Sequence, residues 1–177
     1  MITITEALAE IKTAQARIAK RREGVLPYVI RDARLRDPLE SDGGSAEFVR
    51  RELQAIGDLE ERVVQIRTAI QQVNLATTVT IEGESRTISA WLNWRRDIAP
   101  GQRETYNKLH RTITQARTAA TQRGGRLTEQ GVSEQPVDII VAVRERDLLA
   151  QMEHLEATLG LLDGRLSLLN ATTTIEV

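Results

Sequence analysis

The sequence predicts a mainly α-helical fold: an antiparallel up-down bundle of four helices with coiled-coil heptads, and a small sheet of a β-hairpin and terminal strands at one end. Apolar residues at heptad spacing in two long segments predict the helices. Short β-branched runs at both termini and near residue 80 predict the sheet. The 177 residues are expected to form a single elongated domain.

The first helix is expected over about residues 3–24. Thr3 and Glu6 stand at the spacing of a capping box at its start. One apolar stripe follows, made of Ile4, Leu8, Ile11 and Ile18. The β-branched segment Met1–Ile4 is a candidate strand. Glycines and prolines indicate a loop over residues 24–44, which is a candidate contact segment for a partner.

The second helix is expected over about residues 45–74, with Ser45 as its N-cap. Two seam positions repeat along it at heptad spacing. They hold Val49, Ile56, Val63 and Ile70 in one seam, and Leu59, Ile66 and Val73 in the other. A β-hairpin is expected next, over about residues 78–88, because two β-branched runs flank a turn that contains Gly83.

The third helix, expected over about residues 88–121, is the least regular. Its apolar face consists of Ile88, Trp91, Leu92, Ile98, Tyr106, Leu109 and Ile113. Pro100 and Gly101 interrupt this face, which predicts a kink or a break in the helix. A glycine-rich loop is expected from Gln122 to Gln135.

The fourth helix is expected over about residues 137–170 and carries the clearest heptads. Its seam residues are Val141, Leu148, Leu155, Leu162 and Leu169, with Glu145, Met152, Leu159 and Leu166 interleaved. Pro136 and Asp138 suit the first turn of this helix. Residues 172–177 resemble the stretch that follows the second helix, and both stretches are expected to form strands.

Five short stretches, spread over most of the chain, carry a family resemblance. They are Glu6-Ala7-Leu8, Ile70 to Thr78 with its Asn74, Leu92 to Asp97, Pro136-Val137-Asp138, and Leu162-Asp163 through Asn170 to Thr173. In these stretches the chain resembles the septicolysin-like family of small bacterial helical proteins, which implies a helical fold and brings no activity or cofactor with it. A longer loop over residues 24–44 and a β-branched tail depart from the family's pattern. These departures point to a specialised member, such as one recruited into an assembly.

Composition narrows the classes of function. With no Cys, the chain can form no disulfide, thiolate metal site or cysteine nucleophile, which agrees with a reducing compartment. Its apolar runs are too short for a signal peptide or a membrane span, so we expect it in the bacterial cytoplasm or in a virion. The formal net charge of −1 gives no overall attraction to nucleic acid.

No catalytic, cofactor or metal site is expected. The two His residues, His110 and His154, lie on predicted helices without the nucleophile and carboxylate of a triad, and we interpret both as partly exposed helix residues. The sequence lacks His pairs at zinc spacing and acidic calcium loops. An enzyme with an unfamiliar site near Trp91, Trp94 and His110 is a minor alternative.

Two features are candidate contact sites for a partner or a second copy of the chain. Gly160 and Gly164 form a small-xxx-small pair in the last helix, which fits either a tight helix crossing in an oligomer or a thin spot inside the bundle. The C-terminal strand offers an open β-edge for strand addition. The candidate interface residues are Gly160, Gly164, Thr173, Ile175 and Val177.

A basic stripe over residues 95–126, with Trp94 and Tyr106 interleaved, is the candidate patch for nucleic acid. Its residues are Arg95, Arg96, Arg103, Lys108, Arg111 and Arg117. The alternative, which we favour, is a charge match with the acidic last helix. We therefore expect a non-enzymatic structural protein that self-associates and joins other structural proteins, such as a component of a bacteriophage virion, with nucleic-acid binding as the alternative function.

Overall fold

The computed structural model describes residues 1–122, 127–129 and 139–176. The chain is mainly helical, with small two-stranded sheets, which confirms the predicted fold class at this level. It divides into two compact units, residues 1–76 with 167–177, and residues 77–166. Each unit has a hydrophobic core of its own. The single bundle of four helices with coiled-coil heptads is not confirmed by this arrangement and stays a prediction.

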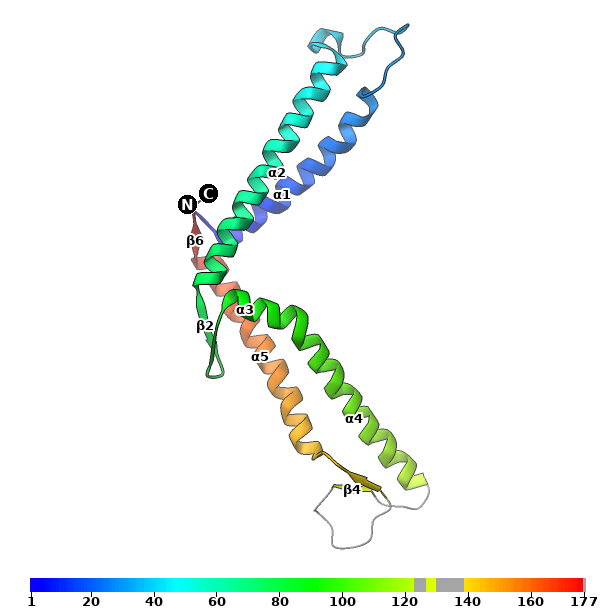
Figure 1. The fold of residues 1–177 in the computed structure, drawn as a ribbon, viewed down its shortest axis with the longest axis vertical. Coiled ribbons are helices and arrows are strands. Elements are labelled where there is room, and N and C mark those ends of the chain that lie inside the picture. The colour runs from blue at the N-terminus through cyan, green and yellow to red at the C-terminus, as the bar shows by residue number, and fades with distance from the viewer. Residues whose placement is uncertain (123–126, 130–138, 177) are drawn as a thin grey trace. The chain divides into compact units, whose positions relative to one another are not determined.

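The first unit is built on two helices, α1 (Ile4–Val25) and α2 (Gly44–Ala76), which lie side by side (Figure 1). Short 3-10 turns at residues 26–28 and 40–42 stand in the loop between them. The core of the unit consists of Ile4, Ala7, Ile11, Ala14, Val63, Ile66 and Ile175. Because Ala7 and Ala14 are small, α1 leaves room for the larger Val63 and Ile66 of α2 to pack against it.

The start of α1 follows the sequence prediction, and the start of α2 differs from it. Thr3 and Glu6 form the predicted capping box, in which the Glu6 N–H donates to Thr3 Oγ1 at 3.2 Å and the Thr3 N–H donates to Glu6 Oε2 at 2.7 Å. Ser45 was expected as the N-cap of α2 but is its second residue and is buried. The cap comes instead from Asp37, whose carboxylate accepts from the Ser45 N–H at 2.9 Å and the Ser45 hydroxyl at 2.6 Å. A carboxylate is the stronger acceptor for a free helix N–H, and a loop can bring it back from earlier in the chain.

The two chain ends meet in the first unit. Strand β1 (Ile2–Thr3) pairs antiparallel with β6 (Thr174–Ile175), with Ile2 opposite Ile175. The candidate strands at both termini therefore form, but they pair with each other. Ile175 is only 3% exposed and belongs to the core between α1 and α2. Its side chain serves the fold of this unit.

The second unit opens with a β-hairpin at the place expected for it. Strands β2 (Thr78–Ile81) and β3 (Glu84–Thr87) pair antiparallel. The two turn residues between them, Glu82 and Gly83, both have positive φ angles, 48° and 85°. This backbone matches the tight turn that suits the twist of a hairpin, and the glycine adopts it without a steric cost.

The irregular third helix has its defect before Pro100. Helix α3 (Ile88–Asn93) continues through a π-helical turn at Trp94–Ile98 into α4 (Ala99–Gln122). The Ala99 N–H donates to the carbonyl of Trp94, five residues back. Pro100 is the second residue of α4, directly after this wide turn, and the wide turn replaces the kink that we predicted at Pro100 and Gly101.

The last helix, α5 (Glu145–Thr172), begins later than the expected Val137. Residues Ile139–Val141 form strand β5, which pairs in parallel with β4 (Leu127–Glu129). Three consecutive β-branched residues favour a strand over a helix. Val141, which the sequence placed in the heptad, lies in this strand and packs beside Leu148 and Ile113 in the core of the second unit. Pro136, Asp138 and most of the loop over residues 122–135 lie outside the described residues.

Candidate functional site

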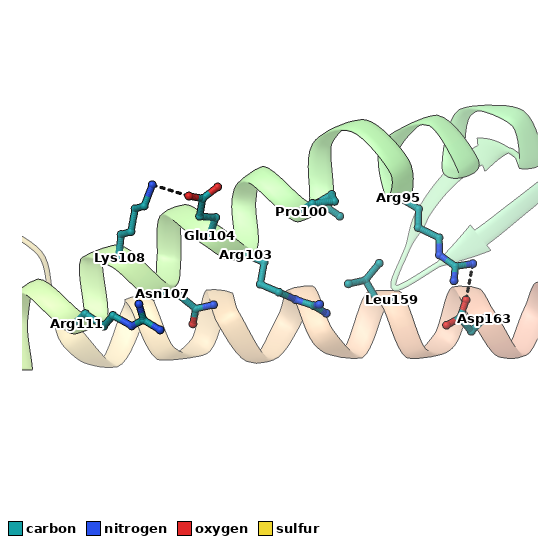
Figure 2. A pocket seen from close by; sticks show the side chains of 10 residues that line it. Arg95, Pro100, Arg103, Glu104, Asn107, Lys108, Arg111, Leu159 and Asp163 are labelled. Carbon is teal, nitrogen blue, oxygen red and sulfur yellow. Dashed lines mark ion pairs between the residues drawn. The ribbon is translucent and has the colours of Figure 1, made fainter.

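A groove of about 550 Å³ lies between α4 and α5 in the second unit. Its basic residues are Arg95, Arg103, Lys108 and Arg111, and α5 contributes Leu159 and Asp163. Arg103 and Arg111 are eight residues apart and therefore share one face of α4. Figure 2 shows both side chains reaching from α4 toward α5, whereas Lys108 lies on the other side of α4. The structure thus brings part of the predicted basic stripe into one groove.

Acidic residues of α5 neutralise much of this stripe. Arg95 lies 2.7 Å from Asp163, and Arg103 lies 2.6 Å from Glu156. Arg117 pairs with Glu145, and the hydrogen bond from Arg117 lowers the pKa of that carboxyl. All three contacts reach across to α5, as a charge match between helices requires. They support the alternative that we favoured for the stripe.

The other basic residues of the stripe divide into paired and unpaired ones. Arg96 lies 2.8 Å from its neighbour Asp97, and Lys108 lies 2.6 Å from Glu104, one turn earlier on α4. Arg111 makes no ion pair with any residue that the structure describes. It is the stripe's one described guanidinium that is open to an anionic ligand in the groove.

A second cavity, of about 270 Å³, lies where the hairpin meets α3 and α5. His154 Nδ1 lies 2.6 Å from Glu82 Oε2, and the Thr158 hydroxyl donates to the same oxygen at 3.1 Å. Thus α5 holds the turn of the hairpin through one carboxylate. Sequence analysis missed this cluster because Glu82 and His154 are far apart in the chain and neither stands in a motif.

Tryptophan side chains line the same cavity and anchor the hairpin from the other side. Trp91 is buried, and its indole N–H donates to the carbonyl of Val79 at 3.0 Å. Arg86 stacks over the Trp91 ring at 4.8 Å, which is a cation–π contact. His110 is not among the residues that line this cavity; its Nε2 lies 3.7 Å from Glu145. The three residues of the minor enzyme hypothesis are therefore not brought together in this cavity.

The chain matches no protein-family model, no curated protein and no solved structure. Among the described residues, no group of three or more His, Cys, Asp or Glu side chains could hold a metal ion. In the same part of the chain, no helix is long and apolar enough to cross a membrane.

The candidate interface residues lie in different surroundings. Gly160 and Gly164 are both exposed, and a Cβ added at either would meet no atom within 4 Å. Thr173 is partly buried, and its carbonyl accepts from the Ile4 N–H at 3.0 Å. Ile175 is buried in its own unit, and Val177 lies outside the described residues. The glycines are thus the candidates with an open surface.

Gly164 belongs to a second exposed face of α5, which we call the outer face. Its apolar residues are Ala150, Ala157, Leu161 and Gly164, and all are exposed. The buried seam of the same helix, Leu148, Leu155 and Leu162, lies about 200° around the helix from it. The sequence prediction for this helix rested on the leucine seam and did not identify the outer face. The signal was present in the small residues Ala150, Ala157 and Gly164, seven residues apart.

Proposed function

We propose that this chain is a non-enzymatic structural protein that self-associates within a larger assembly, such as a bacteriophage virion. The outer face of α5 is the observation that carries the proposal. Leu161, between Ala157 and Gly164 on this face, is 50% exposed, and these small residues on either side of it leave an open apolar strip. Contiguous apolar surface of this kind marks contact sites between proteins. Membership of the septicolysin-like family is part of the proposal and adds no activity to it.

Apolar residues of the first unit support a protein with more than one contact surface. Leu53, Val64 and Leu75 of α2 are all more than half exposed. They stand eleven residues apart, which is about three helical turns, so they form one stripe along α2. Ile30, in the loop after α1, is 86% exposed. A component of an assembly needs several such surfaces, because it meets several neighbours.

The polar clusters of the chain have structural partners, which supports a role without catalysis. Glu82 and His154 hold the hairpin against α5, and Glu145 holds Arg117 of α4. Each of these side chains forms its ion pair with a residue of another element. We therefore propose no enzymatic activity and no cofactor for the chain.

The solution mass of the purified chain tests the proposal. Light scattering over a wide range of protein concentrations is expected to give a discrete oligomer that dissociates on dilution. High salt is expected to leave most of the association intact, because apolar contacts are not screened. A monomer at all concentrations and salts would contradict self-association.

Nucleic-acid binding in the groove between α4 and α5 is a second candidate. Arg111 favours it, since this guanidinium faces the groove and pairs with no described residue. The expected result is a mobility shift of DNA or RNA at low salt that weakens in Arg111→Gln but not in Arg17→Gln, a matched change on α1. Each lost phosphate contact is expected to lower the salt slope by about 0.9. The absence of any shift at low salt would remove this candidate.

A further inference from the structure

We propose that the cavity where the hairpin meets α3 and α5 binds a single sugar residue, a neutral ring that stacks on Trp94 and hydrogen-bonds to Gln102 and Gln151. This binding site goes beyond the proposed self-association and does not depend on it. The cavity has a volume of about 270 Å³. Ordinary small-molecule sites measure about 300–1,000 Å³, so this cavity suits a ligand of one ring.

Aromatic side chains are concentrated in this cavity. The chain has only two Trp, two Tyr and one Phe. Both tryptophans and one tyrosine line the cavity, namely Trp91, Trp94 and Tyr106. The core of the first unit is built from aliphatic side chains alone, so burial does not by itself require aromatic rings in this fold. Aromatic rings with a few polar groups are the usual lining of a ligand site.

The two tryptophans differ in the contacts that they leave open to a ligand. Trp91 is 1% exposed, its indole N–H donates to the Val79 carbonyl, and Arg86 stacks over its ring. Trp94 is only partly buried and stands nearly perpendicular to Trp91, with ring centroids 5.6 Å apart and an interplanar angle of 83°. Trp91 therefore covers at most one face of Trp94. The indole N–H of Trp94 donates to no residue that the structure describes.

Polar side chains with open hydrogen-bonding capacity line the same cavity. Gln102 of α4 and Gln151 of α5 contribute their amides, and Tyr106 contributes its hydroxyl. None of these three side chains hydrogen-bonds to a residue in the described part of the chain. Each amide offers two donors and an acceptor, and a sugar hydroxyl likewise donates and accepts. Two amides on different helices can thus bind hydroxyls at different positions of one ring.

The charged side chains of the cavity are paired with each other, which favours a neutral ligand. Glu84 pairs with Arg86 in the hairpin, and Glu82 lies 2.6 Å from His154 Nδ1. A cation would find both carboxylates already paired and the Trp91 ring already covered by Arg86. An anion would meet the carboxylates of Glu82 and Glu84. A neutral ring with hydroxyl groups disturbs none of these pairs, and its weakly positive C–H groups suit the negative face of an aromatic ring.

The indole N–H signals of an NMR spectrum test the site directly, because the chain has two tryptophans and both line the cavity. The wild-type chain is titrated with glucose, galactose, mannose and N-acetylglucosamine. At least one sugar is expected to shift the Trp94 signal in a saturable way and the Trp91 signal less, since the Trp91 N–H stays bonded to Val79. Trp94→Phe assigns the two signals. No saturable shift with any of these sugars would overturn the proposal.

Substitutions test the two kinds of contact, with calorimetric titration as the measurement and circular dichroism as the check on folding. Trp94→Ala removes the stacked ring and is expected to weaken binding of that sugar roughly tenfold, whereas Trp94→Phe is expected to keep most of the affinity. Gln151→Ala is expected to weaken binding about fivefold through the lost hydrogen bond. Gln72→Ala, the same change at an exposed Gln of α2, is the control and is expected to bind as the wild type does. Wild-type affinity in both Trp94→Ala and Gln151→Ala would rule out this site.

Further ligands test the chemical class and distinguish its sources. Choline is a cation, and sorbitol has the hydroxyls of a sugar without the ring. Both are expected to bind far more weakly than the sugar, and equal or tighter binding of either would contradict a stacked neutral ring. A free monosaccharide and the last residue of a glycan chain share the same ring. Undiminished binding of the methyl glycoside would assign the site to the end of a glycan chain, and loss of binding would assign it to a free sugar.

Discussion

At the scale of single residues, a few side chains fix loops that the sequence leaves undetermined. Asp37 is the clearest case, because it accepts from the Ser45 hydroxyl, from the Ser45 N–H and from the Leu39 N–H. These hydrogen bonds, the one from the Ser45 hydroxyl first, lower the pKa of Asp37 from 3.8 to about 2. A carboxyl that is easier to ionise in the folded state stabilises that state wherever it is charged.

We predict that Asp37→Asn lowers the stability of the loop and the start of α2, and that this effect depends on pH. Because the folded pKa lies below the usual value, the contribution of Asp37 is complete above about pH 4 and is lost as the pH falls toward 2. The difference in thermal midpoint between wild type and variant is therefore expected to shrink over that range. Asp42→Asn, the same change on an Asp of the same loop, is the control. An equal difference at pH 7 and pH 2 would contradict this assignment.

A second prediction for single residues follows from the backbone conformation at Gly83. Gly83 has a φ of 85° in the hairpin turn, a region in which a Cβ is strained. Gly83→Ala is expected to lower the free energy of unfolding by about 1–2 kcal/mol. Gly57→Ala, inside α2 and with no atom within 4 Å of the new Cβ, is expected to raise it by about 0.5–1 kcal/mol. Urea denaturation measures both, and changes of equal sign would contradict the explanation.

At the scale of elements, the terminal strands close the first unit. The pairing of β1 with β6 brings Ile175 into a core that also holds Ile4 and Ile66. This arrangement leaves the outer face of α5 as the better candidate for contact with a second copy, because the side chain of Ile175 is already buried. The tail that we expected to meet neighbouring subunits instead joins the two ends of one chain.

Truncation of this side chain tests the role of β6. Ile175→Ala is expected to lower the free energy of unfolding by about 2–5 kcal/mol, because it removes buried methyl groups and leaves a cavity. Thr174→Ala, on the exposed side of the same strand, is expected to stay within about 0.5 kcal/mol of wild type. Chemical denaturation followed by circular dichroism measures both. A wild-type stability for Ile175→Ala would show that the strand does not contribute to the core.

At the scale of the whole molecule, local signals predicted much of the fold. The capping box at Thr3 and Glu6 marked the start of α1, and Gly83 marked the turn of the hairpin. The predicted start of α5 was wrong, because Val141 lies in a strand and still fits the seven-residue spacing. Spacing alone cannot distinguish a strand residue from a helix residue at such a position. Irregular helix geometry, such as the π-turn before Pro100, depends on packing that a sequence pattern does not contain.

The candidate sites were predicted less completely than the fold. The basic stripe and Gly160 with Gly164 were found from composition and spacing. Their meaning depends on contacts across the chain: the arginines meet acidic residues of α5, and the glycines stay open. The contact of Glu82 with His154 could not be predicted, because it joins a hairpin turn to a distant helix. Such contacts arise only when the elements are placed together.

The most direct test of self-association through α5 is the oligomer dissociation constant of Leu161→Glu, measured by sedimentation equilibrium beside the wild type and Leu109→Glu. Leu109 is also a partly exposed leucine, on α4, so the control repeats the same chemical change away from the outer face. We predict that Leu161→Glu is a folded monomer, since it places a charge in the centre of the apolar contact, and that Leu109→Glu associates as the wild type does. Equal dissociation constants for the two variants would contradict a contact through this face.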